Sequence, residues 1–269
     1  MWKDVVGAGG LFILSGGITV AMAYDVADVP HGGTVVGRVA FHGDPPAPRV
    51  FEVEKDPDLC GAERQLTDVA VREGWLQGAV VVLEGVTKGK PFADRSFKED
   101  PPGEGKFEYA AGDTLSLEVR AKKCSWGPFT GVLAPDQPIR FQNEDPVKHT
   151  LHTYVTIGHK GLVLRTIHNR DISPHAAFDR AFTARKLNDS HVVKLTCDRH
   201  NFMQNWLYVV ETPYFSISNQ DGAFTIDHVP PGRYQLLAWH PTLGLQRQAV
   251  TVEADQTVDA DFTFQQQDR

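Results

Sequence analysis

Three side chains that bind soft metals follow one another at intervals of three residues within positions 197–203. Cys197, His200 and Met203 supply a thiol, an imidazole and a thioether, and they lie between two segments of strand character. A thiolate, two imidazoles and a weakly bound thioether are the ligands of a type 1 copper centre. Soft sulfur ligands favour Cu(I), and imidazole suits both oxidation states. The spacing therefore predicts a copper site that needs one further histidine.

The best candidate for the missing ligand is His149, which comes shortly after a predicted strand and 48 residues (197 minus 149) before Cys197. An interval of this length holds about four strands with their connections. An even number of strands can return the chain to the same end of a β-sandwich. We therefore predict that His149, Cys197, His200 and Met203 hold one copper ion.

A metal-free interpretation of the same residues is also open. Cys197 would then be a small buried apolar residue, Met203 a core filler and His200 a hydrogen-bonded loop residue. Met203 is the only methionine after position 22, so its offset from a cysteine and a histidine favours the metal site. Two other copper arrangements lack sequence support: the chain has no His-x-His motif of multicopper oxidases and no second cysteine near Cys197 for a binuclear centre.

Two further histidines, His152 and His240, are weaker candidates for ligands. His152 lies three residues after His149, so on a strand the two side chains point to opposite faces. We expect His152 not to be a ligand. His240, in Trp239-His-Pro, is expected at a domain interface or on the surface.

On these residues the sequence resembles the cupredoxin family, most closely its amicyanin and plastocyanin type. The resemblance covers roughly residues 137–211, with the loop Cys197-x-x-His-x-Phe-Met203 and the pair His149-x-x-His152. It implies a Greek-key β-sandwich that passes single electrons outside the cytoplasm, with the four ligands named above. Phe202 also matches the family loop, and we expect it to lie beside His200 where a redox partner docks.

Two positions depart from the family pattern. Thr150 follows the first ligand where the family usually has Asn, and Asn201 follows His200 where amicyanin-like loops have Pro. The first change affects a hydrogen bond between the two ligand loops, and the second loosens the loop around His200. Neither removes a ligand, so the metal is easier to predict than its redox potential.

The N-terminal residues 1–23 have the features of a secretory signal. Lys3 precedes an uncharged apolar run over residues 5–22, which ends in the small-x-small sequence Ala21-Met-Ala23. Cleavage after Ala23 is the preferred interpretation. An uncleaved membrane anchor is the alternative, because about 18 apolar residues is near the lower limit for spanning a bilayer. Both predict export to the periplasm or the cell exterior.

Export changes what the three cysteines mean. No Cys-x-x-Cys occurs, so a c-type haem site, a zinc ribbon and a thioredoxin-like motif lack support. Cys60 and Cys124 are expected to form a disulfide, because the compartment is oxidising and the metal needs the third thiol. Two separate buried thiols are the alternative.

The composition excludes several classes of protein. The 269 residues carry 34 Asp and Glu against 27 Lys and Arg, a formal charge of -7, which argues against a nucleic-acid-binding basic stripe. With 41% apolar residues the chain can bury a core, and its length allows one large or two smaller domains.

Outside the N-terminal segment the chain has almost no helical periodicity. Short runs rich in Val, Thr, Phe and Tyr recur between Gly and Pro clusters, which is typical of all-β sandwiches and barrels. Residues 87–106 are expected to form an exposed loop, and residues 161–189 show no clear period. The expected strands cover residues 33–41, 76–83, 115–119, 139–143, 192–196, 206–211, 214–218, 223–227, 233–239 and 257–264.

We expect two β-domains, a cupredoxin-like sandwich over residues 24–211 and a smaller sandwich over residues 212–269. The C-terminal segment resembles transthyretin-like, carboxypeptidase-regulatory domains through Asp221-Gly-x-Phe-x-Ile and Val229-Pro-Pro-Gly-x-Tyr234. Such modules are usually structural or adhesive. The N-terminal strands are expected to complete the copper sandwich, and a small β-domain of their own is the alternative.

These observations predict an exported type 1 copper protein that carries single electrons and is not an enzyme. Its partner would be a redox protein, such as a cytochrome or a copper- or quinone-dependent oxidoreductase. The acidic balance would steer a basic partner surface if the charge lies near the copper end. Two alternatives are a copper chaperone or storage module with the same ligands, and a metal-free adhesive or carbohydrate-binding β-protein.

Overall fold

The computed structural model describes residues 24–92, 106–111, 115–157, 163–188 and 190–266. The predicted signal segment, residues 1–23, and most of the predicted exposed loop lie outside these ranges. None of the helices described is both long and apolar enough to cross a membrane.

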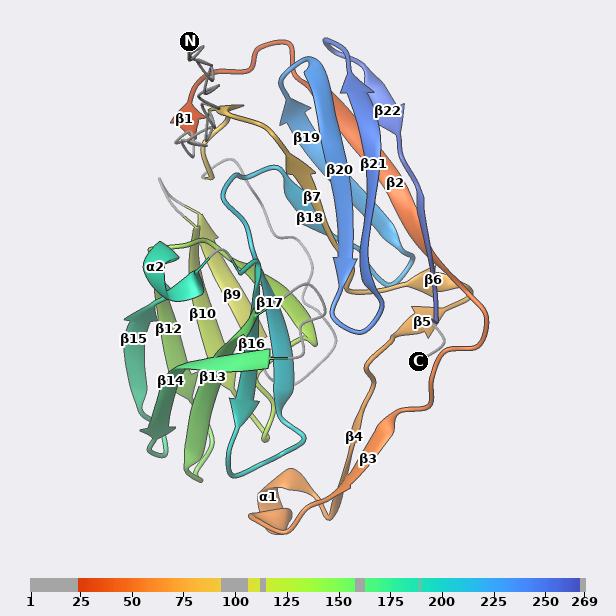
Figure 1. The fold of residues 1–269 in the computed structure, drawn as a ribbon. Helices are drawn as coiled ribbons and strands as arrows, with labels where there is room; N and C mark the ends of the chain where they lie inside the picture. Colours follow the sequence, from red (N-terminus) through yellow and green to blue (C-terminus); the bar gives the residue numbers. More distant parts are fainter. Residues whose placement is uncertain (1–23, 93–105, 112–114, 158–162, 189, 267–269) are drawn as a thin grey trace, which may run out of the picture.

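The described chain is nearly all β-structure and forms two sandwiches, one above the other in Figure 1. The strands are β1 (Asp25–Val26), β2 (Gly33–His42), β3 (Arg49–Glu52), β4 (Glu63–Leu66), β5 (Val71–Arg72), β6 (Trp75–Leu76), β7 (Val80–Glu84), β8 (Lys88–Gly89), β9 (Lys106–Ala111), β10 (Leu115–Ala121), β11 (Thr130–Leu133), β12 (Pro138–Asn143), β13 (His149–Ile157), β14 (Val163–Ile172), β15 (Ala177–Ala181), β16 (Val192–Cys197), β17 (Gln204–Val209), β18 (Phe215–Ile217), β19 (Ala223–Val229), β20 (Gly232–His240), β21 (Gly244–Val252), β22 (Thr257–Asp259) and β23 (Phe262–Gln265). The helices, one turn each, are α1 (Pro57–Cys60) and α2 (Ala184–Leu187).

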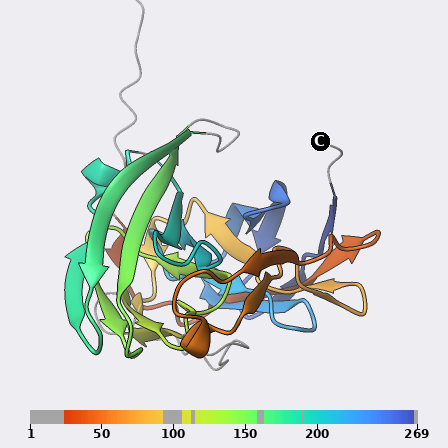
Figure 2. The same cartoon turned by 90° about the horizontal axis from the view of Figure 1, so that it is seen from below.

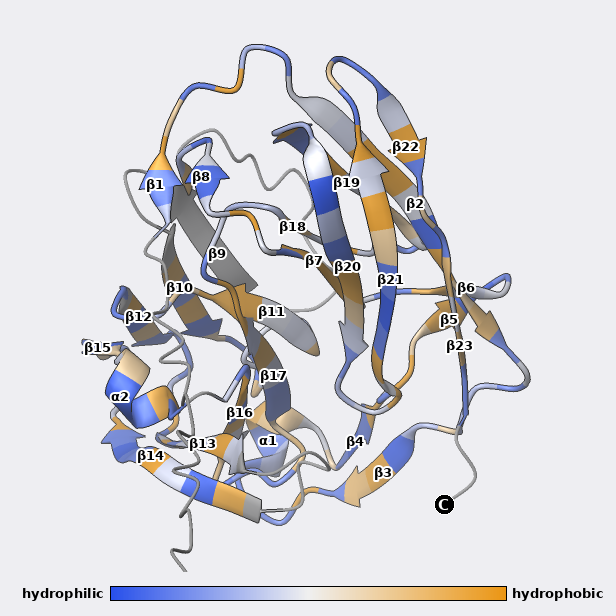
Figure 3. Cartoon of the chain, turned by 45° about the horizontal axis from the view of Figure 1, so that its top comes forward, coloured by the Kyte–Doolittle hydropathy of each residue, from blue (hydrophilic) through white to orange (hydrophobic). Residues whose placement is uncertain are grey.

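The first sandwich packs a five-stranded sheet against a four-stranded sheet, and it is called here the copper sandwich because it contains the residues predicted to bind copper. The strand orders are β11-β17-β16-β13-β14 and β15-β12-β10-β9. Apolar and polar residues alternate along β10, as Figure 3 shows, because one face of each strand packs into the core. Trp126 and Phe141 are among the largest fully buried side chains of that core.

The second sandwich contains the N-terminal strands as well as the C-terminal ones. Its sheets have the orders β18-β7-β20-β21 and β19-β2-β6-β5, and β22 and β23 pair with β2. The expectation that the strands at 33–41 and 76–83 complete the copper sandwich is therefore wrong, and they do not form a domain of their own. The corresponding strands, β2 and β7, lie between C-terminal partners.

The physical reason is visible in β7, whose residues Val80, Val81, Val82 and Leu83 are all buried. A strand covered on both faces has a continuous apolar run instead of an alternating one. Val81 and Leu83 face the core of the second sandwich, and Val80 and Val82 belong to an apolar cluster between the two sandwiches. The apolar run of β7 therefore indicates that both faces of the strand are buried, but it does not indicate which elements cover them.

The interface between the sandwiches is apolar and aromatic. Tyr208 of the copper sandwich lies 5.2 Å, centroid to centroid, from Trp239 of the second sandwich. His240 is buried beside this cluster, with its ring 6.3 Å from that of Phe129. The prediction of an interface position for His240 is confirmed.

Turn chemistry explains part of the C-terminal sandwich. Gly222 has φ +70, as its Asp-Gly turn predicts, and a Cβ there would lie 2.6 Å from the carbonyl oxygen of Val39. Gly232 differs, because it begins β20 and is needed for space: the Tyr234 hydroxyl lies 2.8 Å from the position of a Cβ. The last predicted strand is split into β22 and β23, yet Ala260, Phe262 and Phe264 share a buried face as predicted.

A long β-hairpin with a helical tip leaves the second sandwich after β2 and returns before β5. It consists of β3, α1 and β4, spans residues 49–66, and is called here the hairpin. Seen from below, it passes in front of the loops at the end of the copper sandwich (Figure 2). Phe51, Val53 and Leu59 pack against the core of the copper sandwich. The hairpin is thus an extension of one domain that covers the other.

The unassigned residues 161–189 contain β14, β15 and α2. Together with β13 and β16 they make four strands between His149 and Cys197, as the interval predicted. Both residues consequently lie at the same end of the copper sandwich.

His240 provides a pH test of the domain interface. Burial lowers its pKa to about 4, against 6.5 for an unperturbed histidine. Between these values the unfolded chain binds a proton that the folded chain does not, so the free energy of unfolding falls as the pH is lowered from 6.5 to 4. We expect His240→Gln to remove about 2 kcal/mol of the stability lost between pH 7 and pH 4.5. Guanidinium unfolding of the metal-free protein measures this loss.

His42→Gln is the control for this measurement, because His42 is exposed at the end of β2. It should lose as much stability on acidification as the unsubstituted protein. An equal loss in the His240 variant would show that this ring does not control the acid response.

Candidate metal centre

Three of the four predicted ligands converge on one buried point. The Nδ1 atoms of His149 and His200 are 3.1 Å apart, and they lie 3.8 and 3.7 Å from Cys197 Sγ. All three side chains are at most 2% exposed. A point equidistant from these three atoms is about 2.1 Å from each, which suits metal bonds to nitrogen and sulfur. The triangle is therefore the size of a three-coordinate site for a transition metal.

The strands bring these ligands together because β13 begins at His149 and β16 ends at Cys197. The two strands are antiparallel neighbours, with Leu151 opposite Cys197. The loop after β16 closes tightly: the His200 amide donates to the Cys197 carbonyl at 3.3 Å, and the Met203 amide donates to the His200 carbonyl at 2.9 Å. This turn directs His200 back over Cys197.

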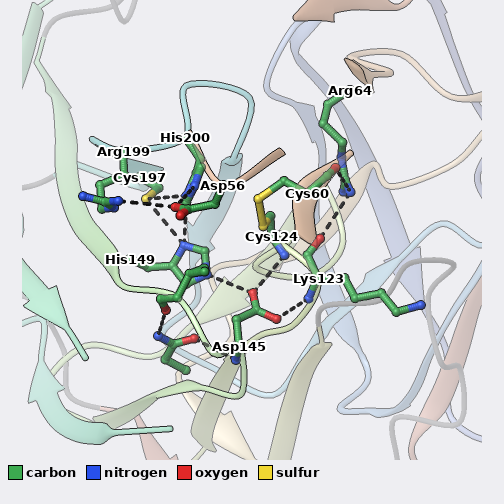
Figure 4. Close-up of a disulfide and its surroundings, with 12 residues drawn as sticks. Asp56, Cys60, Arg64, Lys123, Cys124, Asp145, His149, Cys197, Arg199 and His200 are labelled. Carbon is green, nitrogen blue, oxygen red and sulfur yellow. Dashed lines mark hydrogen bonds and ion pairs between the residues drawn. A yellow bond between two sulfur atoms is a disulfide. The ribbon is translucent and has the colours of Figure 1, made fainter. Parts of the chain in front are cut away.

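Each ligand imidazole is held on its far side by a carboxylate. His149 Nε2 lies 2.9 Å from Asp145 Oδ2, and His200 Nε2 lies 3.1 Å from Asp56 Oδ2 (Figure 4). A neutral imidazole that donates Nε2–H to a carboxylate keeps its lone pair on Nδ1. Both Nδ1 lone pairs then face each other and the sulfur. Three such donors in a dry space repel one another unless a cation lies between them, so the residues fit a bound metal.

The surroundings of Cys197 also favour the form that binds metal. Burial alone would raise the pKa of its thiol, but its polar contacts with His149 and His200 and the hydrogen bond from the Thr150 amide lower it to about 6. The Thr150 amide lies 3.3 Å from the sulfur. At neutral pH the side chain is therefore mainly the thiolate, which is the metal-binding species.

Asp145 and His149 form a buried, charge-assisted pair. Burial would raise the pKa of Asp145, but hydrogen bonds from His149 and from the backbone amides of Cys124 and Lys123 lower it. Burial likewise opposes the charged form of His149, and its contacts with Asp145 and Cys197 raise its pKa. Asp145 thus fixes the orientation of His149 and draws electron density toward its Nδ1.

Met203, the predicted axial ligand, is 2% exposed and is buried in the same core as Cys197. Its carbonyl accepts a hydrogen bond of 3.2 Å from the Cys197 amide, so the two ligand residues are joined at the base of the loop. The residue is therefore at the right end of the sandwich for the role that the resemblance implies.

Asp56 has a backbone conformation that suits a functional position. It precedes α1 with φ 57 and ψ 40, in the left-handed region, and its side chain makes no capping hydrogen bond to the helix. An aspartate before a helix would ordinarily cap it. Here the carboxylate contacts His200 and Arg199 instead, the latter at 3.3 Å. The Asp56 side chain therefore holds His200 and leaves α1 without a side-chain cap.

The hairpin covers the ligand loop, which corrects the prediction for Phe202. That side chain is only 6% exposed, because Phe51 lies edge-on at 6.5 Å and the Arg64 guanidinium lies 5.4 Å from its ring centroid. Phe202 is beside His200, as predicted, but it is not on a free docking surface. A Phe202→Asp change would bury a charge instead of altering a docking face.

The predicted disulfide between Cys60 and Cys124 is present. It links the hairpin helix α1 to the turn after β10. Cys60 follows Asp56 on that helix, and the Cys124 amide donates to Asp145 at 2.9 Å. The bridge therefore connects the segment that carries Asp56 to the turn whose amide holds Asp145 (Figure 4).

The two departures from the family loop have visible replacements. The Thr150 hydroxyl donates to Asp171 at 2.6 Å, and the ligand segments are joined by backbone atoms, because the Asp198 amide donates to the Thr150 carbonyl at 3.0 Å. Asn201 is exposed, and its carbonyl accepts a hydrogen bond of 2.6 Å from the Gln204 side chain. Both loops are fixed without the usual side chains.

His152 lies on the other face of β13 from the metal centre, as predicted. Its Nδ1 is 3.0 Å from Asp198 Oδ1, and its ring stacks on Tyr154 at 4.0 Å. Among the described residues the buried metal-binding groups involve only Cys60, Cys124, Asp145, His149, Cys197 and His200.

Sequence reasoning missed Asp56 and Asp145. Asp145 lies four residues before His149, a spacing that could have indicated a carboxylate for the ligand. Asp56 lies 144 residues before His200, in a segment with no motif, so only the fold brings it to the site.

Comparison with known proteins gives partial matches. Residues 208–265 match the carboxypeptidase regulatory-like domain family, which covers β18–β23 but not β2 or β7. No curated protein matches the chain.

Several solved structures are similar to part of the chain. A reduced Cu(I) form of an amicyanin variant is 15% identical, with a TM-score of 0.27, and the match covers 40% of this chain and 100% of the amicyanin. A Cu(I) form of another amicyanin variant is 18% identical, with a TM-score of 0.28, covering 40% of this chain and 95% of the other. A purple cupredoxin from Nitrosopumilus maritimus is 18% identical, with a TM-score of 0.24, covering 31% and 79%.

Asp56 provides a test of the carboxylate contact from the hairpin. Asp56→Asn preserves the shape of the side chain and tolerates the left-handed backbone, but it removes the charge that polarises His200. We expect about a tenfold loss of copper affinity, measured by competition with a chelator.

Asp58→Asn is the matched control, since Asp58 is exposed on the same helix two residues later. It should leave the affinity unchanged. Equal affinities for the Asp56 variant and the unsubstituted protein would mean that the contact does not support the metal.

Proposed function

We propose that this protein is an exported type 1 copper protein that carries single electrons between redox partners. The observation that carries this proposal is the buried triangle of His149 Nδ1, His200 Nδ1 and Cys197 Sγ, with sides of 3.1, 3.8 and 3.7 Å. A copper ion held there by two imidazoles and a thiolate, with Met203 as the axial ligand, would supply a reversible one-electron couple. No bond in a substrate is made or broken.

The residues around the triangle support electron transfer because they keep the ligands in place. Asp145 and Asp56 orient the two imidazoles, and the Thr150 amide donates to the Cys197 sulfur. Ligands that are fixed in advance need little rearrangement when the charge of the site changes. A chaperone would use the same donors but would have to release them, and the locked imidazoles disfavour that second function.

The route for the electron is suggested by Asp56, a partly exposed group that touches a ligand imidazole from outside. His200 is 1% exposed, whereas the Asp56 side chain, hydrogen-bonded to its Nε2, is 24% exposed. The contact through Asp56 therefore replaces the open imidazole edge that the loop position predicted. A redox partner would dock on the hairpin tip instead of on Phe202.

The charge on the hairpin favours a basic partner. Glu52, Glu54, Asp58 and Glu63 are exposed on it, near the copper end. Residues 106–211, which form the copper sandwich, contain 14 Lys and Arg against 11 Asp and Glu, so the sandwich alone carries +3. The hairpin therefore adds acidic groups to the surface near the metal, where Asp198 of the copper sandwich is also exposed. Long-range attraction would raise the encounter rate with a cationic docking face.

The cysteines support the proposed export. A disulfide persists in oxidising compartments, and the remaining cysteine is buried among metal ligands. The second sandwich supports the copper site by supplying the hairpin. It therefore has a specific role at the site, in addition to the structural role expected for carboxypeptidase-regulatory-like domains.

Visible absorption and electron paramagnetic resonance test the copper centre directly. Cu(II) added to the protein should give an intense blue band with narrow copper hyperfine splitting, because thiolate-to-copper charge transfer requires the Cys197 sulfur. Cys197→Ser should abolish the band. Weak, colourless copper binding in the unsubstituted protein would instead favour the metal-free β-protein interpretation.

The docking face is tested by charge reversal on the hairpin. Glu54→Lys with Asp58→Lys should slow reduction of the cupric protein by hexaammineruthenium(II) about five- to tenfold at low ionic strength, without changing the blue band, since attraction of the cation is lost. Stopped-flow absorption measures the rate.

The matched control is Glu253→Lys with Asp259→Lys, which makes the same change in net charge on exposed residues of the second sandwich. Its rate should stay close to that of the unsubstituted protein. Equal slowing in both double variants would contradict an entry point at the hairpin.

A further inference from the structure

The Cys60–Cys124 bridge lies against the metal centre and not merely near it. A ring nitrogen of His200 and the sulfur atoms of both cysteines are all within 4.8 Å of one another, and all three residues are buried. The Cys124 sulfur also lies within 4.8 Å of the ligand atoms of Asp145 and His149. Both soft sulfur atoms are thus adjacent to His200, and Cys124 Sγ is also adjacent to His149.

Other contacts would keep these sulfur atoms in place if the bridge opened. Phe51, Val53 and Leu59 bury apolar surface against the copper sandwich. The Arg64 guanidinium donates at 3.2 Å to the carbonyls of both Cys60 and Lys123, and so spans the two sides of the bridge. These contacts do not involve the S–S bond, so we expect them to hold the hairpin in place after the bond is reduced.

Opening the bridge would create two thiols beside an imidazole. An external dithiol that breaks the S–S bond transfers two electrons and two protons to Cys60 and Cys124 and is itself oxidised to a disulfide. Thiolate ligands select Cu(I), and imidazole is compatible with it. While the two sulfur atoms are joined, Cys60, Cys124 and His200 do not form a metal site. After reduction the same three residues offer two thiolates and an imidazole, which are the donors of a Cu(I) site.

We propose that reduction of Cys60–Cys124 creates a second metal site, which binds a soft monovalent ion of the Cu(I) class through the two thiolates with His200 beside them. The site lies between the hairpin helix and the first centre, so it is placed as a loading position through which copper reaches Cys197. Closure of the disulfide removes the site and leaves the first centre covered. This second site does not require that the first centre transfer electrons.

Anaerobic titration with Cu(I) in competition with bathocuproine disulfonate tests the proposal. The protein with its disulfide intact should bind one Cu(I) tightly. The same protein, reduced with a phosphine and then desalted, should bind two. No gain in tightly bound Cu(I) on reduction, with three free thiols counted before loading, would overturn the proposal.

Two variants locate the second ion. Cys197→Ser removes the first centre, so it should bind one Cu(I) only after reduction. Cys60→Ser with Cys124→Ser should bind one Cu(I) whether or not it is treated with phosphine. A second Cu(I) that persists in this double variant would place the ion elsewhere and refute the site. Because the Cys197→Ser arm does not use the first centre, failure of the blue copper test and failure of the dithiol site are distinguishable.

If the double variant does not fold, X-ray absorption of the reduced, loaded Cys197→Ser protein gives the answer. Two sulfur neighbours at the copper edge are expected. One sulfur or none would overturn the proposal.

Discussion

The metal centre depends on one physical arrangement, the fixing of two buried imidazoles by two carboxylates. Buried between Cys197 and apolar core residues, His149 and His200 could turn either ring nitrogen inward, and only one tautomer and one ring orientation point both lone pairs at the sulfur. Asp145 and Asp56 select that state by accepting from Nε2. The rest of the site follows from the need to hold those two carboxylates beside the copper sandwich.

The carboxylates reach their positions by different routes. Asp145 belongs to the copper sandwich and is itself held by backbone amides of Lys123 and Cys124. Asp56 comes from the hairpin of the other sandwich, where the Cys60–Cys124 bridge fixes it to the same turn. That bridge closes a loop of 64 residues, which in a chain-entropy model contributes about 4 kcal/mol to the stability of the folded chain. One covalent link therefore joins the segment that carries Asp56 to the turn that holds Asp145.

The domain topology explains why such a hairpin is available. β2 pairs with β19, β22 and β23, so the chain must begin the second sandwich before it builds the first. The connection from β2 to β5 passes close to the copper end, and it carries β3, α1 and β4 across the ligand loop. If β2 and β7 had belonged to the copper sandwich, the hairpin between them would not have been a segment of the second sandwich. The apolar cluster around Tyr208 and Trp239 then holds the two sandwiches in a fixed relation.

Local patterns predicted most of what is local. Soft ligands at fixed offsets predicted the positions of Cys197 and His200, and the interval to His149 predicted the four strands that bring the chain back to the same end. Alternation predicted the buried face of β23, and an Asp-Gly pair predicted the positive φ of Gly222. These features depend on near neighbours in the sequence, for which backbone geometry and side-chain period are sufficient.

The features that escaped prediction are those set by distant partners. The apolar run of β7 is equally compatible with either sandwich, because it records that both faces are buried and not by what. Phe202 has the same residue type whether the loop is open or covered, and its burial is decided by Phe51 and Arg64, more than 130 positions earlier. Nothing in the sequence around Asp56 distinguishes it from the other acidic residues, because only the fold of the hairpin brings it to His200.

Under the proposed function, covering the ligand loop has opposite effects on two properties of the site. Burial of His200 would keep water and adventitious ligands from a bound metal, and it strengthens the hydrogen bond to Asp56 by lowering the local dielectric. The same burial removes the imidazole edge as a direct contact for a partner. A hydrogen bond to a partly exposed carboxylate reconciles the two, because the group that fixes the ligand also reaches the surface. Under the proposed function the hairpin is therefore both the cover of the site and the part of it that a redox partner would contact.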